Sequence, residues 1–129
     1  MRLSREELAP ATSPVETGDW LMNRFGMTTK LVVLPGKRDV LVDLLLVAAE
    51  RMADAPACYL YVVSMSMEEP DAVWVSEAWR SKNHYEAWMS RPDVIQRISA
   101  MTSFIAGRSE PVLIVPVGGK GLKVRRPKP

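Results

Sequence analysis

The stretch that decides the fold is Asp71–Pro92, DAVWVSEAWRSKNHYEAWMSRP. Alternation with a period of two predicts a strand in its first half, with Val75, Glu77 and Trp79 sharing one face. The opposite face also carries a large aromatic side chain, Trp74. A serine follows the strand and can cap a helix, and the final proline can open a second helix. The stretch therefore predicts a strand followed by two helices.

The first of these helices carries aromatic side chains on one arc. Trp88 follows Tyr85 by three residues and His84 by four, so it neighbours both on the helix surface. The preceding strand delivers Trp79 next to this helix. Together these residues predict an aromatic-lined wall, which suits a flat apolar ligand.

Cysteine and histidine counts exclude several site classes. The chain has 129 residues with one cysteine and one histidine, so it supports neither an internal disulfide framework nor a zinc site. We interpret Cys58 as a small buried hydrophobic residue and expect no metal. A glycine-rich run at 118–121 has no helix behind it, so it does not predict a phosphate-binding loop.

The charge distribution limits the partners. The net charge is +2, yet the last ten residues hold five basic side chains and no acid. Five charges are too few to indicate nucleic-acid binding. No apolar run approaches the roughly 18 residues of a membrane span, and the first ten residues lack the apolar core of a signal peptide. We expect a cytoplasmic protein that binds neither nucleic acid nor a membrane.

The predicted elements alternate in a recognisable order. Strands are expected at Met27–Leu34, Ala57–Met67, Ala72–Trp79 and Pro111–Val117, and helices at Lys37–Ala53, Lys82–Ser90 and Pro92–Ile105, the last closed by Gly107. This is the β-α-β-β-α-β order of an α+β, ferredoxin-like fold with a four-stranded antiparallel sheet. Residues 27–118 would form the domain, 1–26 an N-terminal extension and 119–129 a basic C-terminal tail.

The sheet should need cover on both faces. Large apolar residues fall on both faces of its strands, while the helices cover only one of them. A second copy of the chain is the simplest cover, because dimers with identical contacting patches are the commonest assemblies. We expect a homodimer.

Several short motifs follow one another along the chain at the boundaries of the predicted elements. They are Pro35-Gly36-Lys37, Ala55-Pro56-Ala57-Cys58, Pro70-Asp71, Glu77-x-Trp79 and Pro92-Asp93-Val94. Through them Met27–Gly121 resembles the antibiotic biosynthesis monooxygenase family. The resemblance implies a dimeric α/β barrel. It also implies oxygenation of a quinol-like aromatic substrate by dioxygen without a cofactor.

Two branches of that family can be compared residue by residue. The quinone-forming branch has a tryptophan and a tyrosine that match Trp79 and Tyr85. It also has an asparagine where this chain has Val75, and a helix arginine whose place lies within one residue of Arg97. The haem-degrading branch shares Trp88 and has a first-strand asparagine near Thr29. Its axial histidine falls on Ile98 here, and haem without an axial donor is held weakly.

The candidate site combines both lines of argument. Catalytic roles fall to Trp79, Tyr85, His84 and Glu77, and substrate binding to Trp88, Val75, Arg97 and Met89. Structural alternatives stand beside these roles. A core position would also explain the tryptophans, a solvent-exposed position would explain the histidine and the arginine, and an ion pair would explain the glutamate.

Two classes of function stay open. The first is a cofactor-independent monooxygenase that acts on a quinol or other dihydroxyaromatic substrate. The second is a non-catalytic dimeric barrel that binds a small apolar metabolite. A base inside the binding site would support catalysis, and an all-apolar cavity would support binding.

Overall fold

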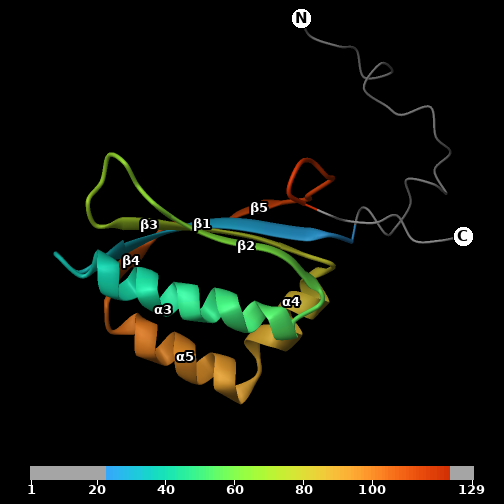
Figure 1. Ribbon diagram of the computed structural model, residues 1–129, viewed down its shortest axis with the longest axis horizontal. Helices are drawn as coiled ribbons and strands as arrows, with labels where there is room; N and C mark the ends of the chain where they lie inside the picture. Colours follow the sequence, from blue (N-terminus) through green and yellow to red (C-terminus); the bar gives the residue numbers. More distant parts are fainter. Residues whose placement is uncertain (1–22, 123–129) are drawn as a thin grey trace, which may run out of the picture.

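The computed structural model describes residues 23–122, so most of the expected extension and of the basic tail lies outside the described residues. A single sheet has helices on one of its faces (Figure 1). In chain order the elements are β1 (Phe25–Val33), α3 (Arg38–Arg51), a 3₁₀ turn (Met52–Asp54), β2 (Cys58–Met65), β3 (Ala72–Trp79), α4 (Lys82–Met89), α5 (Pro92–Thr102), β4 (Ile105–Arg108) and β5 (Val112–Ile114).

The sheet confirms the α+β, ferredoxin-like fold class but has five strands, where four were expected. Its order is β2-β3-β1-β4, and β5 also pairs with β1, all antiparallel. The fifth strand arises because two short strands, and not one long strand, pair with the same edge of β1. β4 pairs with Leu31–Val33 and β5 with Gly26–Thr28, and residues 109–111 separate them. Pro111 lies in that interval and has no N–H to donate to a ladder.

The end of the last helix was also predicted wrongly. The helix expected over Pro92–Ile105 ends at Thr102, and Ile105–Arg108 forms β4 instead. Gly107 therefore lies within a strand, opposite Val32, and does not close the helix. Hydrogen bonds to a strand more than seventy residues away in the sequence decide this segment, and helical periodicity cannot reveal them.

Alternation along the strands sorts the two faces of the sheet. The helix-facing residues of β1 and β3 pack into two hydrophobic clusters beneath α3, α4 and α5. One cluster centres on Leu41, Val73 and Met101, under α3 and α5. The other centres on Trp79 and Trp88, under α4. No helix of residues 23–122 is both long and apolar enough to cross a membrane.

The face away from the helices carries a row of partly exposed apolar side chains. Register places Val62, Ser76, Thr28 and Val112 side by side across the sheet, and a neighbouring row ends at Ile114. Side chains of directly opposed residues share a face. The exposed large hydrophobic residues of this face are Val62, Trp74, Val112 and Ile114.

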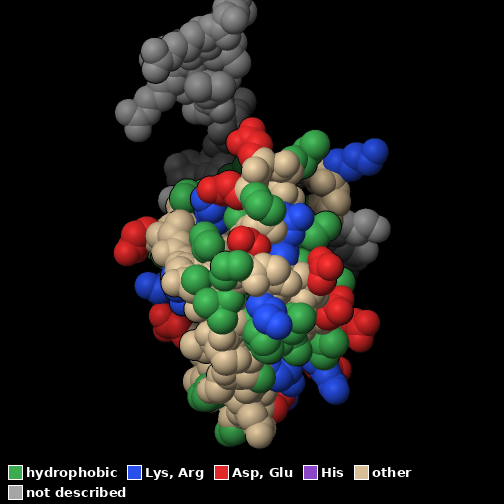
Figure 2. All heavy atoms as spheres, turned by 90° about the vertical axis from the view of Figure 1, so that its left-hand side faces the viewer, with side chains coloured by type: hydrophobic (Ala, Val, Ile, Leu, Met, Phe, Trp, Pro, Cys, Tyr) green, Lys and Arg blue, Asp and Glu red, His purple; other side chains and the backbone are tan. Residues whose placement is uncertain are grey.

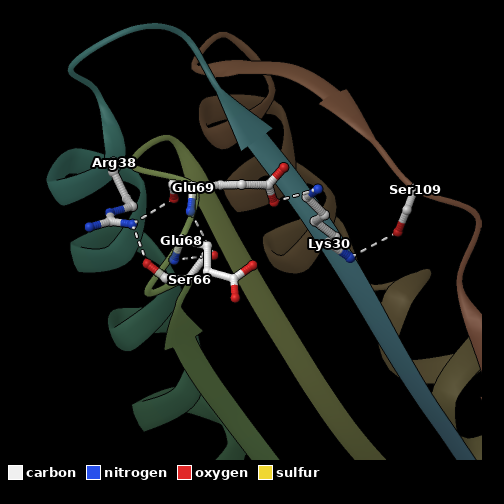
Figure 3. A network of polar contacts seen from close by, with 6 residues as sticks. All are labelled: Lys30, Arg38, Ser66, Glu68, Glu69 and Ser109. Carbon is white, nitrogen blue, oxygen red and sulfur yellow. Dashed lines mark hydrogen bonds and ion pairs between the residues drawn. The ribbon is translucent and has the colours of Figure 1, made fainter.

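The end of the sheet distant from α4 is closed by the polar turn, residues 66–71, between β2 and β3 (Figure 1). Ser66 Oγ accepts the backbone N–H groups of Glu68 and Glu69, and Arg38 Nη1 donates to the carbonyls of Ser66 and Glu69 (Figure 3). Lys30 Nζ lies 2.5 Å from Glu69 Oε2. Figure 2 faces this end and shows acidic and basic side chains interspersed on it.

Candidate active site

Four aromatic rings meet between the sheet and α4, and we call them the aromatic layer: Phe25, Trp79, Tyr85 and Trp88. The Tyr85 ring centroid lies 5.1 Å from that of Phe25 and 5.8 Å from that of Trp79. Trp79 and Trp88 lie 6.5 Å apart. Trp79 is the last residue of β3, and Tyr85 and Trp88 belong to α4. The structure thus brings together the three aromatic residues that the sequence placed on one wall.

Local sequence explains why α4 begins where it does. Ser81 is extended and its hydroxyl accepts the backbone N–H of His84, at 3.2 Å, which caps the helix as expected. The cap fixes the first turn directly after Trp79. Tyr85 is therefore held against the strand end, and it is half-buried, so one side of the aromatic layer meets solvent there.

Phe25 is a member of this layer that sequence reasoning missed. It belongs to the segment expected as an extension, yet β1 begins at this residue and pairs it with Trp79. The signal was present, because Phe25 continues the alternation of Met27, Thr29 and Leu31.

Glu77 lies beside the aromatic layer on the same face of β3. Its side chain is buried, with 9% of the residue exposed, and Trp79 Nε1 donates to its Oε1 at 2.9 Å. Within residues 23–122 no Lys, Arg or His forms an ion pair with it. Burial raises the pKa of the Glu77 carboxyl, and the indole hydrogen bond opposes that effect in part. The described residues therefore do not support the alternative that Glu77 is held in an ion pair.

Three further titratable groups surround this carboxylate. Burial, and then the negative charge of Glu77, raise the pKa of Tyr61 and Tyr85, and they raise that of Cys58 to about 11. Tyr61 is the direct cross-strand partner of Glu77 on β2. Sequence reasoning missed it, because only the β2–β3 register reveals that partner. Cys58 is half-buried against the layer, in accord with its interpretation as a hydrophobic residue.

Two buried polar atoms, one on β1 and one in the layer, lack a hydrogen-bond partner among the described residues: Thr29 Oγ1 and Trp88 Nε1. Thr29 is 6% exposed and Trp88 is 7% exposed. The Arg91 guanidinium carbon lies 4.4 Å from the centroid of the Trp88 ring, a contact with the ring face that does not involve the indole N–H. A buried polar group without a partner costs about 1–3 kcal/mol. Each of these two atoms would gain a hydrogen bond from a ligand that reached it.

The other predicted site residues lie in different surroundings. His84 is exposed, with Nδ1 2.6 Å from Ser81 Oγ. Arg97 Nη1 lies 3.4 Å from an Asp93 carboxylate oxygen on the surface of α5. Val75 is buried in the cluster under α3, and Met89 is half-buried against the cluster under α4. Of these four, the structure brings only Met89 into contact with the cluster that holds Trp79.

Across positions 23–122 no group of three or more His, Cys, Asp or Glu side chains is arranged to hold a metal ion. The chemistry that the arrangement offers by itself is a buried carboxylate, hydrogen-bond donors and apolar aromatic surface.

Sequence and structure comparisons place this arrangement in a family. Residues 24–96, more than half of the chain, match the sequence profile described as antibiotic biosynthesis monooxygenase. The chain belongs to that family. No curated protein matches the sequence.

Solved structures of this family share the fold. A candidate antibiotic biosynthesis monooxygenase from Chloroflexus aurantiacus is 35% identical with a TM-score of 0.69, over 78% of this chain and 99% of that one. A second from Caulobacter crescentus is 22% identical with a TM-score of 0.65, over 78% and 94% of the two chains. A third from Nitrosomonas europaea is 12% identical with a TM-score of 0.67, over 74% and 91%. The last two likenesses support the fold alone.

Proposed function

We propose that this member of the antibiotic biosynthesis monooxygenase family oxidises a quinol or other dihydroxyaromatic substrate with dioxygen, without a metal or an organic cofactor. The observation that carries the proposal is Glu77, a buried carboxylate with no cationic partner among the described residues, beside the aromatic layer. Perturbed acids that lie in such surroundings occur preferentially at functional sites.

The reaction balances with the substrate as the only reductant. Glu77 takes a proton from a ring hydroxyl, and the resulting phenolate gives one electron to dioxygen. Superoxide and the substrate radical combine, which forms a carbon–oxygen bond at a ring C–H position. The oxygen–oxygen bond then breaks as the C–H proton leaves. One oxygen atom stays as a quinone carbonyl, and the other leaves as water with the C–H proton and the proton that Glu77 had taken, which restores the carboxylate.

Each residue near the carboxylate has a role that suits this chemistry. A carboxyl whose pKa is raised by burial is a stronger base toward a phenol than an exposed one is. Trp79 donates to Glu77 and orients it, while Tyr85 and Trp88 supply apolar surface for a flat ring. Exclusion of water by these rings strengthens the electrostatic interactions of the developing phenolate.

The proposal includes a homodimer that forms through the face of the sheet away from the helices. Trp74, Val112 and Ile114 are 36–58% exposed on that face, and a second copy would remove them from water. Light scattering should give twice the chain mass, and Trp74→Lys should shift the protein toward the monomer. A wild-type monomer at micromolar concentration would contradict the dimer. A cytoplasmic location belongs to the same proposal.

The decisive test of the proposed function is oxygen consumption. Metal-stripped protein is incubated with a panel of dihydroxynaphthalenes and with anthrone, and oxygen uptake is compared with buffer and with anaerobic controls. We expect uptake by wild type. We expect a loss of about tenfold or more in Trp79→Phe, which removes the hydrogen bond to the base, and a smaller loss in Tyr85→Phe.

The matched control for these variants is Trp74→Phe, because the same substitution is then made on the opposite face of β3. It should leave the rate per active site unchanged. If wild type consumes oxygen no faster than buffer with any member of the panel, catalysis is refuted, and saturable binding of the same compounds would then support the metabolite-binding alternative.

A further inference from the structure

Thr29 is the least explained buried side chain of the described residues. It lies in the middle of β1, is 6% exposed and has a hydroxyl with no hydrogen-bond partner among residues 23–122. Its neighbours on the same face of β1, Met27 and Leu31, are apolar and pack against the helices. Packing alone would favour valine here, which has the same branched shape without the hydroxyl.

The strand register places this hydroxyl next to the proposed base. Thr29 lies directly opposite Val75, and Met27 lies directly opposite Glu77. Thr29 and Glu77 are therefore diagonal neighbours on one face of an antiparallel pair, where Cα atoms are about 7–8 Å apart. Diagonal neighbours are within reach of a long side chain such as that of Glu77, so a substrate oxygen bound at the Thr29 hydroxyl would lie in range of the carboxylate.

Nothing in the surrounding sheet uses the Thr29 hydroxyl. Val75, its partner on β3, has no polar side-chain atom. On the other side of β1, residues 109–111, which lie between β4 and β5, interrupt the strand pairing. The nearest hydroxyl there, Ser109 Oγ, accepts the backbone N–H of Lys30 at 3.1 Å. A donor and a base thus share a face. Among the described residues the base has a partner, Trp79, and the donor has none.

We propose that the Thr29 hydroxyl donates a hydrogen bond to the substrate oxygen from which Glu77 removes the proton. It then holds that oxygen while negative charge develops on it. The inference rests on the proposed function, because it assigns a donor to the same site. It makes Thr29 a catalytic residue that contacts the substrate and selects rings that carry an oxygen atom at that position.

The chain offers a closely matched set of variants. Thr29→Val removes the hydroxyl and keeps the branched shape, and Thr29→Ser keeps the hydroxyl. Thr28→Val makes the same change one residue away, on the face of the sheet opposite to Glu77. Equilibrium dialysis measures the binding of two probes, 1-naphthol and naphthalene, which differ by one oxygen atom. Thermal unfolding and oxygen uptake are measured on the same samples.

We expect Thr29→Val to bind 1-naphthol about tenfold more weakly and naphthalene as tightly as wild type does. Its melting temperature should rise by roughly 4 °C, because an unpaired buried hydroxyl is removed. Oxygen uptake with a substrate of the panel should fall at least as much as naphthol affinity does. Thr29→Ser and Thr28→Val should bind both probes within about twofold of wild type.

Three results would overturn the inference. The first is an unchanged ratio of naphthol to naphthalene affinity in Thr29→Val, the second is a lower melting temperature of that variant, and the third is no binding of 1-naphthol by wild type. The two proposals can fail separately. Selective naphthol binding that depends on Thr29, without oxygen uptake by wild type, refutes the oxygenation and supports the donor. Uptake that is equal in wild type and Thr29→Val supports the oxygenation and refutes the donor.

Discussion

Polar side chains at the polar turn and on the helix-facing side of the sheet differ in exposure and in the number of their partners. At the polar turn, Lys30, Arg38 and Glu69 all have partners, and the Lys30 and Glu69 side chains keep 25% and 54% of their surface exposed. On the helix-facing side of the sheet, Glu77 and Thr29 are 9% and 6% exposed. Among residues 23–122 Glu77 forms no ion pair and the Thr29 hydroxyl no hydrogen bond.

This comparison distinguishes polar groups whose partners stabilise the fold from buried polar groups whose presence the fold alone does not explain. An exposed ion pair such as Lys30–Glu69 contributes little, since water competes for both groups. A buried carboxylate or hydroxyl with too few partners destabilises the native state. Sites of that kind are expected where a ligand supplies the missing partner. Glu69 at the turn is thus a natural control for Glu77.

The largest expected difference between the two glutamates is in the rate of oxygen uptake. Glu77→Gln keeps the shape and an oxygen that can accept from Trp79 but removes the base. We expect kcat to fall by about 10²–10⁴, the usual contribution of a general base. Glu69→Gln should stay within about twofold of wild type. Equal activity of Glu77→Gln and wild type across the substrate panel would remove Glu77 from the mechanism.

The reactivity of Cys58 should report the charge of Glu77. With a pKa of about 11, caused by burial and by the Glu77 carboxylate, the thiol should react with iodoacetamide at pH 8 roughly 100-fold more slowly than an exposed cysteine. Glu77→Gln removes the nearby negative charge and should speed the reaction. Glu69→Gln should not. An unchanged rate in Glu77→Gln would show that the two groups are not electrostatically linked.

Stability should depend on pH through the buried Glu77 carboxyl. The pKa of Glu77 is raised in the native state, so between its unfolded value near 4.5 and its native value the native chain binds more protons. The free energy of unfolding contributed by Glu77 is therefore present below about pH 4.5. It is lost as the pH rises through the native value. Each tenfold difference in proton affinity between the two states is worth about 1.4 kcal/mol.

Glu77→Gln should therefore be more stable than wild type at neutral pH, and the difference should shrink toward pH 4.5. Urea unfolding of both proteins at a series of pH values measures it. A variant that is less stable than wild type at pH 7 would indicate a favourable partner for the carboxylate and would contradict the raised pKa.

The smallest expected effect is at the polar turn. Glu69→Gln breaks the ion pair with Lys30 and should lower the free energy of unfolding by less than about 1 kcal/mol, because the pair is partly exposed. That loss should vanish in 1 M salt, where exposed charges are screened. If Glu69→Gln lowered the free energy of unfolding by several kcal/mol, the exposed ion pair would contribute far more than its exposure suggests, and the contrast with Glu77 would fail.

The sequence determined the elements whose signals are local. β3 was predicted with the bounds that it has, Ala72–Trp79, because strict alternation and a flanking turn define it. α4 begins at Lys82 as predicted, since Ser81 caps it. The family and the ferredoxin-like order also follow from motifs in the sequence, and the profile match confirms the family.

Only the tertiary structure decided which residues lie next to one another across the sheet. The sequence predicted a helix that runs to Ile105 and is closed by Gly107, and only the pairing of β4 with β1 showed that Ile105–Arg108 is a strand. Tyr61 and Thr29 became candidates because the register sets one opposite Glu77 and the other diagonal to it. The burial of Glu77 with no ion pair among the described residues is likewise a property of the packed layers. Periodicity reports which face a side chain takes, whereas its neighbours on that face depend on hydrogen bonds between segments distant in the chain.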